Sequence, residues 1–217
     1  LQLGSAGVRP TAQWGAKATL EATSAPVGSG NLGAGTGATV GKLLGPERAT
    51  KGGLGNALLE CDDGVLVGAL AAVNAVGEVF DSASGQTIAG VRATVPGRYE
   101  SAVDLALGTL ESGALIGTNT TLGVIATNVQ LSKAQLKKVA EMAHDGLARA
   151  VRPVHTLFDG DTIFAVSVTN SPRQSQEVTP QLMNKLGVAA AAAVQSAILN
   201  AVRSATSIDG VPAQKDW

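Results

Sequence analysis

Two consecutive apolar runs joined by a tight turn constrain the fold of this 217-residue chain more than any other feature. Residues 54–61 and 65–73 flank the tripeptide Asp62-Asp63-Gly64. Such a turn is typical of a β-hairpin, because glycine adopts positive φ at no steric cost. The second run, VLVGALAAV, is apolar on both faces. This pattern indicates a strand buried in a layered α/β protein.

The elements predicted on either side of this hairpin extend the same pattern. Helical spacing follows Pro10 up to residue 22, and residues 121–129 and 162–168 have the composition of strands. Ser132 and Gln135 form a capping box that opens one helix, and Thr179-Pro180 opens another over residues 181–204. The order helix, strands, connector, strand, helix, strand, helix predicts sheets covered by helices within one structural domain.

Residues 77–117 show the weakest pattern in the chain. They contain turn-forming stretches at 81–85 and 94–98, and the run from 99 to 113 lacks a convincing helix cap. Loops this long within compact domains are usually functional or disordered. We therefore expect a mobile connector at about residues 77–119, which divides the chain into an N-terminal part (1–119) and a C-terminal part (120–217).

The composition excludes several classes of function. Hydrophobic residues make up 45% of the chain and charged residues 15%, as in globular proteins. A net charge of −1 with 3% aromatic residues offers neither a basic surface for phosphates nor rings for stacking bases. This argues against nucleic acid partners. The single cysteine, Cys61, excludes an internal disulfide and fits a reducing compartment, so we expect a cytoplasmic protein.

The most apolar segment is predicted to be a core helix and not a membrane span. Residues 186–202 (LGVAAAAAVQSAILNAV) are too few to cross a bilayer and include Gln195, Ser196 and Asn200. The small residues suit a helix packed closely inside a protein. The chain also begins at Leu1 without a methionine, so we expect a processed or truncated piece of a longer protein.

The glycine-rich stretch GTGATVGK, residues 35–42, lacks the spacing of a phosphate-binding loop. That motif needs glycine where Thr36 stands and a hydroxyl residue where Leu43 stands. We expect a tight backbone loop; alternatively, the loop surrounds a reaction site into which Lys42 points.

The two histidines, His144 and His155, are too few for a convincing zinc site, and no cysteine cluster supplements them. We expect His144 to pack beside an apolar helix face. His155 is expected to form a structural hydrogen bond, with a direct part in chemistry as the alternative. Neither a metal nor an organic cofactor is expected.

The stretch GTNTTLGVIATN, residues 117–128, places two threonines where a polar turn enters an apolar strand. One interpretation is a plain turn, with Asn119 opening an accidental glycosylation motif. The other is that a second chain begins at Thr120. A hydroxyl nucleophile needs a base, and the α-amine of a terminal threonine, with a pKa of about 7.7–8.0, can serve as one. The same hydroxyl can generate that amine by attacking the Asn119 carbonyl and shifting the acyl group onto oxygen.

The turn Asp159-Gly160-Asp161 can complete such a site. Glycine between two aspartates allows both carboxylates to converge, so that one donates a proton while the other accepts. One aspartate would anchor the new ammonium group, and the other would orient the Thr120 hydroxyl. As a plain feature, the same turn is a strand entrance.

These residues carry a resemblance to a known family. The segment NTTLGVIATNVQLSKAQLKKVAEMAHDGLARAVRPVHTLFDGDTIFAVSV, residues 119–168, resembles the self-processing L-aminopeptidase/D-amidase-esterases and β-aminopeptidases. The upstream stretches GAGTGATVGKLLG, KGGLG and VGALAAVNAVGEVFD are similar to the same family. The site is most similar to that of the family's nylon-oligomer (6-aminohexanoate-oligomer) endohydrolases. The resemblance covers nearly the whole chain.

The resemblance implies a four-layer αββα sandwich, similar to N-terminal-nucleophile hydrolases but with different connectivity. It implies cleavage between Asn119 and Thr120 into two chains that stay together, with Thr120 as the nucleophile. It further implies small peptide or amide substrates and an oligomer of the paired chains. The other matching site residues are Asp159 and Asp161 for the paired acids, Lys42 for a lysine near the nucleophile, and Asn74 for an asparagine that helps bind the oxyanion.

The sequence departs from parts of this family. Members that act as aminopeptidases carry a serine nucleophile and a Ser/Glu pair where this chain has Asp159 and Asp161, so their specificity is not implied. The family's chains begin well before Leu1, so the N-terminal part of the fold is expected to be missing. We expect a self-processed amide or peptide hydrolase, either an aminopeptidase or an ω-amino-acid-oligomer hydrolase. The alternatives are an acyl transferase like ornithine acetyltransferase and an unprocessed, inactive scaffold.

Overall fold

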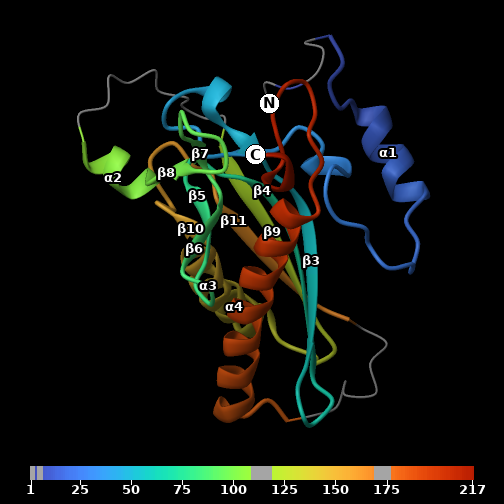
Figure 1. Ribbon diagram of the computed structural model, residues 1–217. Coiled ribbons are helices and arrows are strands. Elements are labelled where there is room, and N and C mark those ends of the chain that lie inside the picture. The colour runs from blue at the N-terminus through green and yellow to red at the C-terminus, as the bar shows by residue number, and fades with distance from the viewer. Residues whose placement is uncertain (1–2, 4–6, 109–118, 169–176) are drawn as a thin grey trace.

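The main sheet has four strands in the order β11-β9-β4-β3. The computed structural model describes residues 3, 7–108, 119–168 and 177–217 (Figure 1). β3 (Gly53–Glu60) and β4 (Leu66–Asn74) form the predicted antiparallel hairpin. β4 pairs antiparallel with β9 (Thr120–Thr127), which pairs in parallel with β11 (Thr162–Ser167). This register places Asn74 opposite Thr120 at one end of the sheet.

Two long helices cover one face of the main sheet. α3 (Lys133–Ala150) begins at the predicted capping box of Ser132 and Gln135. α4 (Pro180–Arg203) begins at Thr179, whose hydroxyl accepts a hydrogen bond from the N–H of Leu182. The helices pack against each other, and α4 lies across β3 and β4 (Figure 1). The residues of β4 buried beneath them alternate along the strand: Val67, Ala69, Ala71 and Val73.

α4 lies close to β3 because both elements present small residues. A β-carbon on Gly53 would lie 2.6 Å from the carbonyl oxygen of Ala201, and one on Gly55 would lie 2.0 Å from that of Ala197. A side chain at either position would displace the helix. α4 is long and apolar enough to cross a membrane by length and composition, but 61% of its most apolar window is buried inside the protein. The prediction of an alanine-rich core helix is confirmed.

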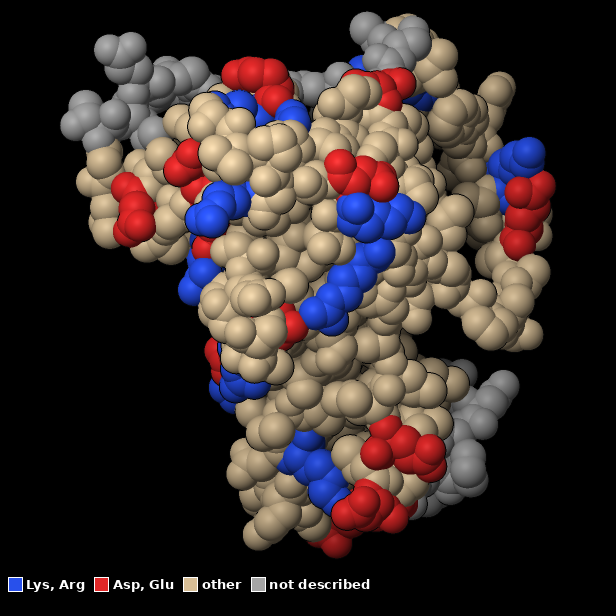
Figure 2. All heavy atoms as spheres, viewed as in Figure 1, with Lys and Arg blue, Asp and Glu red and all other residues tan. Residues whose placement is uncertain are grey.

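The other face of the main sheet is exposed in the described part of the chain. Its exposed apolar residues on β9 and β11 are Leu122, Val124, Phe164 and Val166, with exposed fractions of 38–60%. The described residues therefore form one helical layer and one main β layer of the expected four-layer arrangement. On the face shown in Figure 2, basic and acidic side chains are interspersed among neutral ones.

Short elements surround this framework. β5 (Glu78–Asp81) lies between β6 (Gln86–Ala89) and β10 (Val151–Arg152) in a three-stranded sheet. The remaining strands pair two by two, β1 (Thr39–Val40) with β2 (Thr50–Lys51) and β7 (Val91–Arg92) with β8 (Tyr99–Glu100). α2 (Ala102–Leu107) follows β8. α1 (Ala12–Leu20) is capped at its N-terminus by Thr11, and none of its residues is buried. The 3₁₀ turns are Gly33–Gly35, Pro46–Arg48 and Gln214–Asp216.

The region expected to be a mobile connector contains regular elements over residues 78–107, namely β5 to β8 and α2. Buried polar contacts hold this region to the core. Glu78 is 1% exposed; one of its carboxylate oxygens accepts a hydrogen bond from Arg152 at 2.6 Å and the other accepts the N–H of Ala102 at 3.2 Å. The rest of the expected connector, residues 109–118, lies outside the described residues.

Candidate active site

Thr120, the first residue of β9, lies against the peptide group that precedes it. Its hydroxyl donates a hydrogen bond to the carbonyl oxygen of Asn119 at 2.5 Å. The N–H of Gly160 donates to the same oxygen at 2.9 Å. Asn119 is 1% exposed. A hydroxyl group and a backbone donor thus meet at one carbonyl that is shielded from water.

Strand pairing explains why the Asp-Gly-Asp turn lies beside Thr120. Asn119 forms an isolated parallel bridge with Asp159, just before β9 and β11 begin to pair. A β-carbon on Gly160 would lie 2.9 Å from Thr120 Oγ1, so a larger residue would push against the hydroxyl. The glycine therefore allows the turn to approach the Thr120 hydroxyl as well as to bend.

The two carboxylates of this turn bind different groups. Asp159 Oδ1 accepts the N–H of Val76 at 3.2 Å, and its Oδ2 accepts the hydroxyl of Thr156 at 2.6 Å. Asp161 Oδ1 accepts the N–H of Thr121 at 2.8 Å. In the uncleaved chain the Thr120 hydroxyl donates to Asn119, so the roles expected of the two carboxylates toward a free chain end stay predictions.

Lys42 and Asn74 form a polar pair beside the same strand end. Lys42 Nζ donates to Asn74 Oδ1 at 2.9 Å and to the Asn74 carbonyl oxygen at 3.2 Å. The N–H of Thr39 donates to Asn74 Oδ1 at 3.1 Å. Because Lys42 Nζ and the Thr39 N–H both donate to Oδ1, the side-chain oxygen of Asn74 is the atom turned toward Lys42. Since Asn74 is paired with Thr120, Lys42 and Asn74 both belong to the cluster around the Thr120 hydroxyl.

Burial changes the acid–base chemistry of Lys42. Its side chain is almost fully enclosed, and this burial lowers its pKa from the ordinary 10.5 to about 7, with the charge of Asp159 acting in the opposite direction. An amine with a pKa near 7 can both accept and donate a proton at neutral pH. Lys42 is therefore suited to proton transfer at this site.

The glycine-rich stretch before Lys42 is the tight backbone loop that the sequence predicted. Gly41 has a φ of 70°, and a β-carbon there would lie 2.0 Å from the carbonyl carbon of Gly90. The N–H groups of Gly41 and Lys42 donate to the carbonyls of Gly77 and Val76 at 2.9 Å. These contacts fix the loop against the end of β4 and direct Lys42 toward Asn74.

A second buried lysine, which sequence reasoning missed, supports this loop. The ammonium group of Lys51 donates to the carbonyl oxygens of Gly35, Ala38 and Gly52 at 2.7–2.9 Å, and the residue is 0% exposed. Lys51 is paired with Thr39 across β1 and β2. Because the pairing is between residues distant in sequence, no local pattern around Lys51 signals its role.

The two histidines lie side by side next to the acidic turn. His144 Nδ1 and His155 Nε2 are 3.3 Å apart, and His155 Nδ1 is 3.0 Å from Asp161 Oδ2. The expectation that His155 forms a structural hydrogen bond is met by this contact with Asp161. His144 contacts a second imidazole ring, which its position on an apolar helix did not predict.

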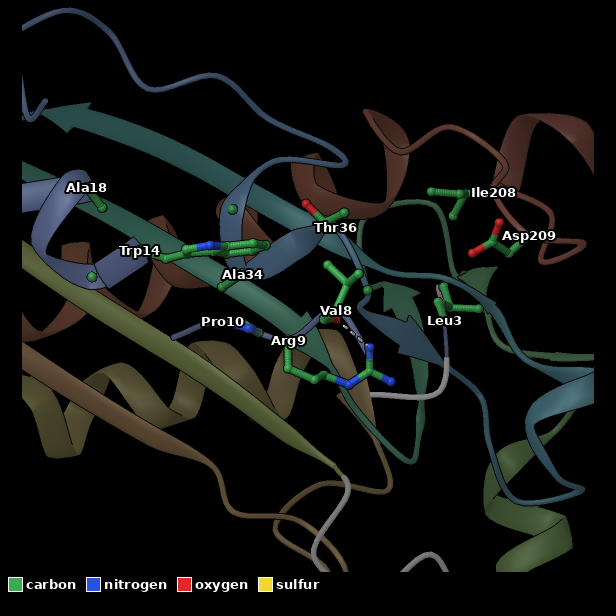
Figure 3. Close-up of a pocket in the computed structure, with 13 residues that line it drawn as sticks. Leu3, Val8, Arg9, Pro10, Trp14, Ala18, Ala34, Thr36, Ile208 and Asp209 are labelled. Carbon is green, nitrogen blue, oxygen red and sulfur yellow. Dashed lines mark hydrogen bonds between the residues drawn. The ribbon is translucent and has the colours of Figure 1, made fainter. Parts of the chain in front are cut away.

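An apolar pocket of about 630 Å³ lies between α1 and the glycine-rich loop (Figure 3). Trp14 of α1 faces Ala34 of the loop, and Arg9 and Asp209 also line the pocket. Among the residues that the structure describes, the pocket shares no lining residue with the cluster around Thr120. It is therefore a different feature of the surface from the candidate active site.

Solved structures define the class of fold. The chain is similar to the β-aminopeptidase of Burkholderia sp., with a TM-score of 0.62 and 24% identity over 94% of this chain and 54% of that one. It is also similar to the L-aminopeptidase D-Ala-esterase/amidase of Ochrobactrum anthropi, whose fold is a variant of the Ntn hydrolase fold. There the TM-score is 0.57 and the identity 25% over 88% of this chain and 48% of that one. The predicted relationship to N-terminal-nucleophile hydrolases is confirmed.

The sequence itself defines the family. Residues 3–215 match peptidase family S58, and the chain belongs to that family. It is 38% identical to an uncharacterized aminopeptidase of Mycobacterium leprae over 98% of this chain and 61% of the relative. It is 30% identical to a 6-aminohexanoate-oligomer endohydrolase of Kocuria sp. over 92% of this chain and 58% of the relative. The chain spans about six-tenths of the length of these curated relatives. The family resemblance seen in the sequence is confirmed.

Proposed function

We propose that this chain is the self-cleaving part of an amide hydrolase that uses Thr120 as an N-terminal nucleophile. The observation that carries the proposal is the meeting of the Thr120 hydroxyl and the Gly160 N–H at the Asn119 carbonyl oxygen, at 2.5 and 2.9 Å. A nucleophile and an oxyanion donor already lie at one peptide group, as an intramolecular acyl shift requires.

Cleavage proceeds in two steps. Thr120 Oγ1 bonds to the Asn119 carbonyl carbon, and the bond from that carbon to the Thr120 nitrogen breaks. The hydroxyl loses its proton and the nitrogen gains one, so the amide becomes an ester with a free amine. The Gly160 N–H stabilises the charge that develops on the carbonyl oxygen. Water then hydrolyses the ester, leaving a carboxylate on Asn119 and a free hydroxyl on Thr120.

After cleavage, Thr120 carries a base of its own. The α-amine, with a pKa of about 7.7–8.0 at ordinary chain ends, takes the hydroxyl proton as Oγ1 attacks a substrate carbonyl. It then passes that proton to the leaving amine. The side-chain amide of Asn74 and nearby backbone N–H groups bind the oxyanion, and Asp159 and Asp161 fix the new chain end. Lys42 exchanges protons with the site at neutral pH.

The two chains stay together because the cleaved bond lies at the end of a central strand that is paired on both sides. β9 begins at Thr120 and is paired along its length with β4, which belongs to the N-terminal part. Substrates are small peptides, amino-acid amides or ω-amino-acid oligomers. Similarity to an aminopeptidase and to a 6-aminohexanoate-oligomer endohydrolase supports this range.

Intact-mass measurement of the purified chain during incubation tests the proposal. The wild-type chain is expected to yield two fragments, cut between Asn119 and Thr120, whose masses sum to the full chain plus one water. Thr120→Ala removes the hydroxyl and should remain a single species. Turnover of amino-acid amides and aminohexanoate oligomers should appear only in the cleaved protein.

Thr121→Val is the matched control for this experiment. Thr121 is the next residue of the same strand, and its hydroxyl is buried with no hydrogen-bond partner among the described residues. Valine preserves its shape and leaves the backbone contact with Asp161 in place, so cleavage should continue. A wild-type chain that stays intact, or a Thr120→Ala chain that is still cut at this bond, contradicts the proposal.

A further inference from the structure

Asp161 is held by a series of contacts that leads from Thr121 to the surface. Its carboxylate is 3% exposed and accepts the Thr121 N–H on Oδ1 at 2.8 Å. Its other oxygen, Oδ2, lies 3.0 Å from His155 Nδ1 and 3.3 Å from the His155 backbone nitrogen. His155 Nε2 lies 3.3 Å from His144 Nδ1. Because the His155 side chain is 41% exposed, the series ends at solvent.

His155 makes both contacts with Asp161 from an unusual backbone conformation. Its φ is 54°, in the left-handed region that residues other than glycine seldom adopt. In this conformation the backbone N–H and the ring nitrogen face the same carboxylate oxygen. A histidine that only fills space needs neither contact. The geometry therefore indicates that His155 acts on Asp161.

The His144 and His155 rings can share one proton in the hydrogen bond between them, but both facing nitrogens cannot be protonated at once. Only one of two nitrogens 3.3 Å apart can be the donor while the other accepts. Burial, and then the charge of His155, lowers the pKa of His144, while Asp161 and Asp145 act in the opposite direction. Of the two rings, His155 is the one with a nitrogen against the Asp161 carboxylate, at 3.0 Å, so a shared proton on that ring faces the negative charge.

We propose that His155 is a positioning residue for the reaction at Thr120, and that with His144 it holds a shared proton that sets the charge Asp161 presents to the new chain end. This rests on the proposed function, because the Thr120 α-amine exists only after cleavage. Asp161 accepts a hydrogen bond from the N–H of Thr121, the residue that follows Thr120, so its carboxylate lies one residue from the new chain end.

The charge of His155 should change how the activity of the cleaved protein depends on pH. When His155 carries the proton, its positive charge compensates the Asp161 carboxylate. Without that charge, the carboxylate stabilises the ammonium form of the Thr120 amine. The ammonium must lose its proton before the hydroxyl has a base. His155 therefore lowers the pH at which the cleaved protein becomes active.

The test measures kcat and KM against pH for cleaved wild-type protein, His155→Gln and His144→Gln, with an amino-acid p-nitroanilide as the probe. His155→Gln should move the midpoint of the rising limb of kcat upward by about half a pH unit or more, with KM little changed. His144→Gln should move the midpoint downward, because the proton then stays on His155. Lys138→Gln, on the exposed surface of α3, is the control and should leave the midpoint unchanged.

The outcomes separate this inference from the proposed function. A structural role alone would reduce the amount of folded protein and leave the midpoint where it is. Equal midpoints in all four cleaved proteins, with equal melting temperatures, would overturn the inference and leave the function standing. A wild-type chain that does not cleave would overturn the function.

In that case NMR of the uncleaved Thr120→Ala chain still tests the histidine pair. The imidazole signals of His144 and His155 should titrate as a coupled pair, and adding His155→Gln should shift the titration of His144. Two independent one-site titrations would overturn the shared proton.

Discussion

Gly160 lies so close to Thr120 that a β-carbon on the glycine would be 2.9 Å from the threonine Oγ1. The same glycine donates its N–H to the carbonyl that this hydroxyl is proposed to attack. Gly160→Ala keeps the N–H group but pushes Oγ1 away from its position. Self-cleavage should slow by about 10-fold or more, since small misplacements of reacting groups have large effects on rate. A time course of intact mass measures this.

Gly15→Ala is the matched control for that substitution. A β-carbon on Gly15, within α1, meets no described atom within 4 Å. Alanine there should leave the cleavage rate unchanged and raise helix stability by at most about 1 kcal/mol. A Gly160→Ala chain that cleaves at the wild-type rate would show that the contact with Thr120 is not limiting.

Self-cleavage should depend on pH through Lys42. The uncleaved chain has no α-amine at Thr120, so titration of that amine cannot make the self-cleavage rate rise with pH. Burial lowers the Lys42 pKa to about 7, so its neutral, proton-accepting form appears above that pH. The cleavage rate should therefore rise through about pH 7. Lys42→Met should lower the rate by about 10²-fold or more, the usual contribution of a general base.

The comparison with Lys17→Met isolates the effect of position. Lys17 lies on α1 with its side chain 72% exposed, so its loss should not alter the rate. If the cleavage rate of Lys42→Met still rises with pH at the wild-type midpoint, Lys42 takes no part in proton transfer.

The elements that sequence patterns predicted are those long enough to repeat a pattern. The β3–β4 hairpin, α3 with its capping box, and α4 each span several turns or strand alternations. Strands β5 to β8 and β10 have two to four residues, too few for an alternation to be recognised. Glu78 adds to the difficulty, because a buried glutamate interrupts the apolar pattern that marks a core strand.

In the candidate site too, some features can be predicted from the local sequence and others cannot. Thr120, the Asp-Gly-Asp turn and Lys42 each have a plain interpretation in the local sequence, and only the family resemblance points to Asn74. The contacts of Lys51 and the His144–His155 pair depend on how distant segments pack. The donor that Gly160 offers to the Asn119 carbonyl is a backbone N–H, which every residue except proline carries. Sequence alone cannot indicate which N–H will point at a carbonyl.

Asn74→Asp should shift the pH dependence of self-cleavage without removing the local hydrogen bonds. The carboxylate would still accept from Lys42 Nζ and from the N–H of Thr39, now with a negative charge at 2.9 Å from Nζ. An adjacent negative charge favours the ammonium form, so the Lys42 pKa should rise above 7. The midpoint of the rise in self-cleavage rate should move to higher pH by about one unit or more. If the rise of the cleavage rate with pH keeps its midpoint in Asn74→Asp, the group that titrates is not Lys42.

Lys51→Met should destabilise the fold. The substitution removes the donor to three backbone carbonyls around a fully buried side chain. Leaving buried acceptors unsatisfied should lower the free energy of unfolding by about 2–4 kcal/mol at pH 7. Urea unfolding in the Thr120→Ala background avoids interference from cleavage. Lys17→Met should change the same quantity by at most about 0.5 kcal/mol, and equal stability of both variants would mean that the three contacts contribute nothing net.

The same lysine should give the stability a particular dependence on pH. Burial lowers the Lys51 pKa from 10.5 to about 8. Between those values the unfolded chain keeps the proton that the folded chain has released, so the unfolded state binds more protons. The free energy of unfolding therefore rises with pH from about 8 to 10.5. Lys51→Met should show a smaller rise, and not none, because burial also lowers the pKa of Lys42. A slope equal to that of the wild-type protein would mean that Lys51 titrates alike in the folded and unfolded chains.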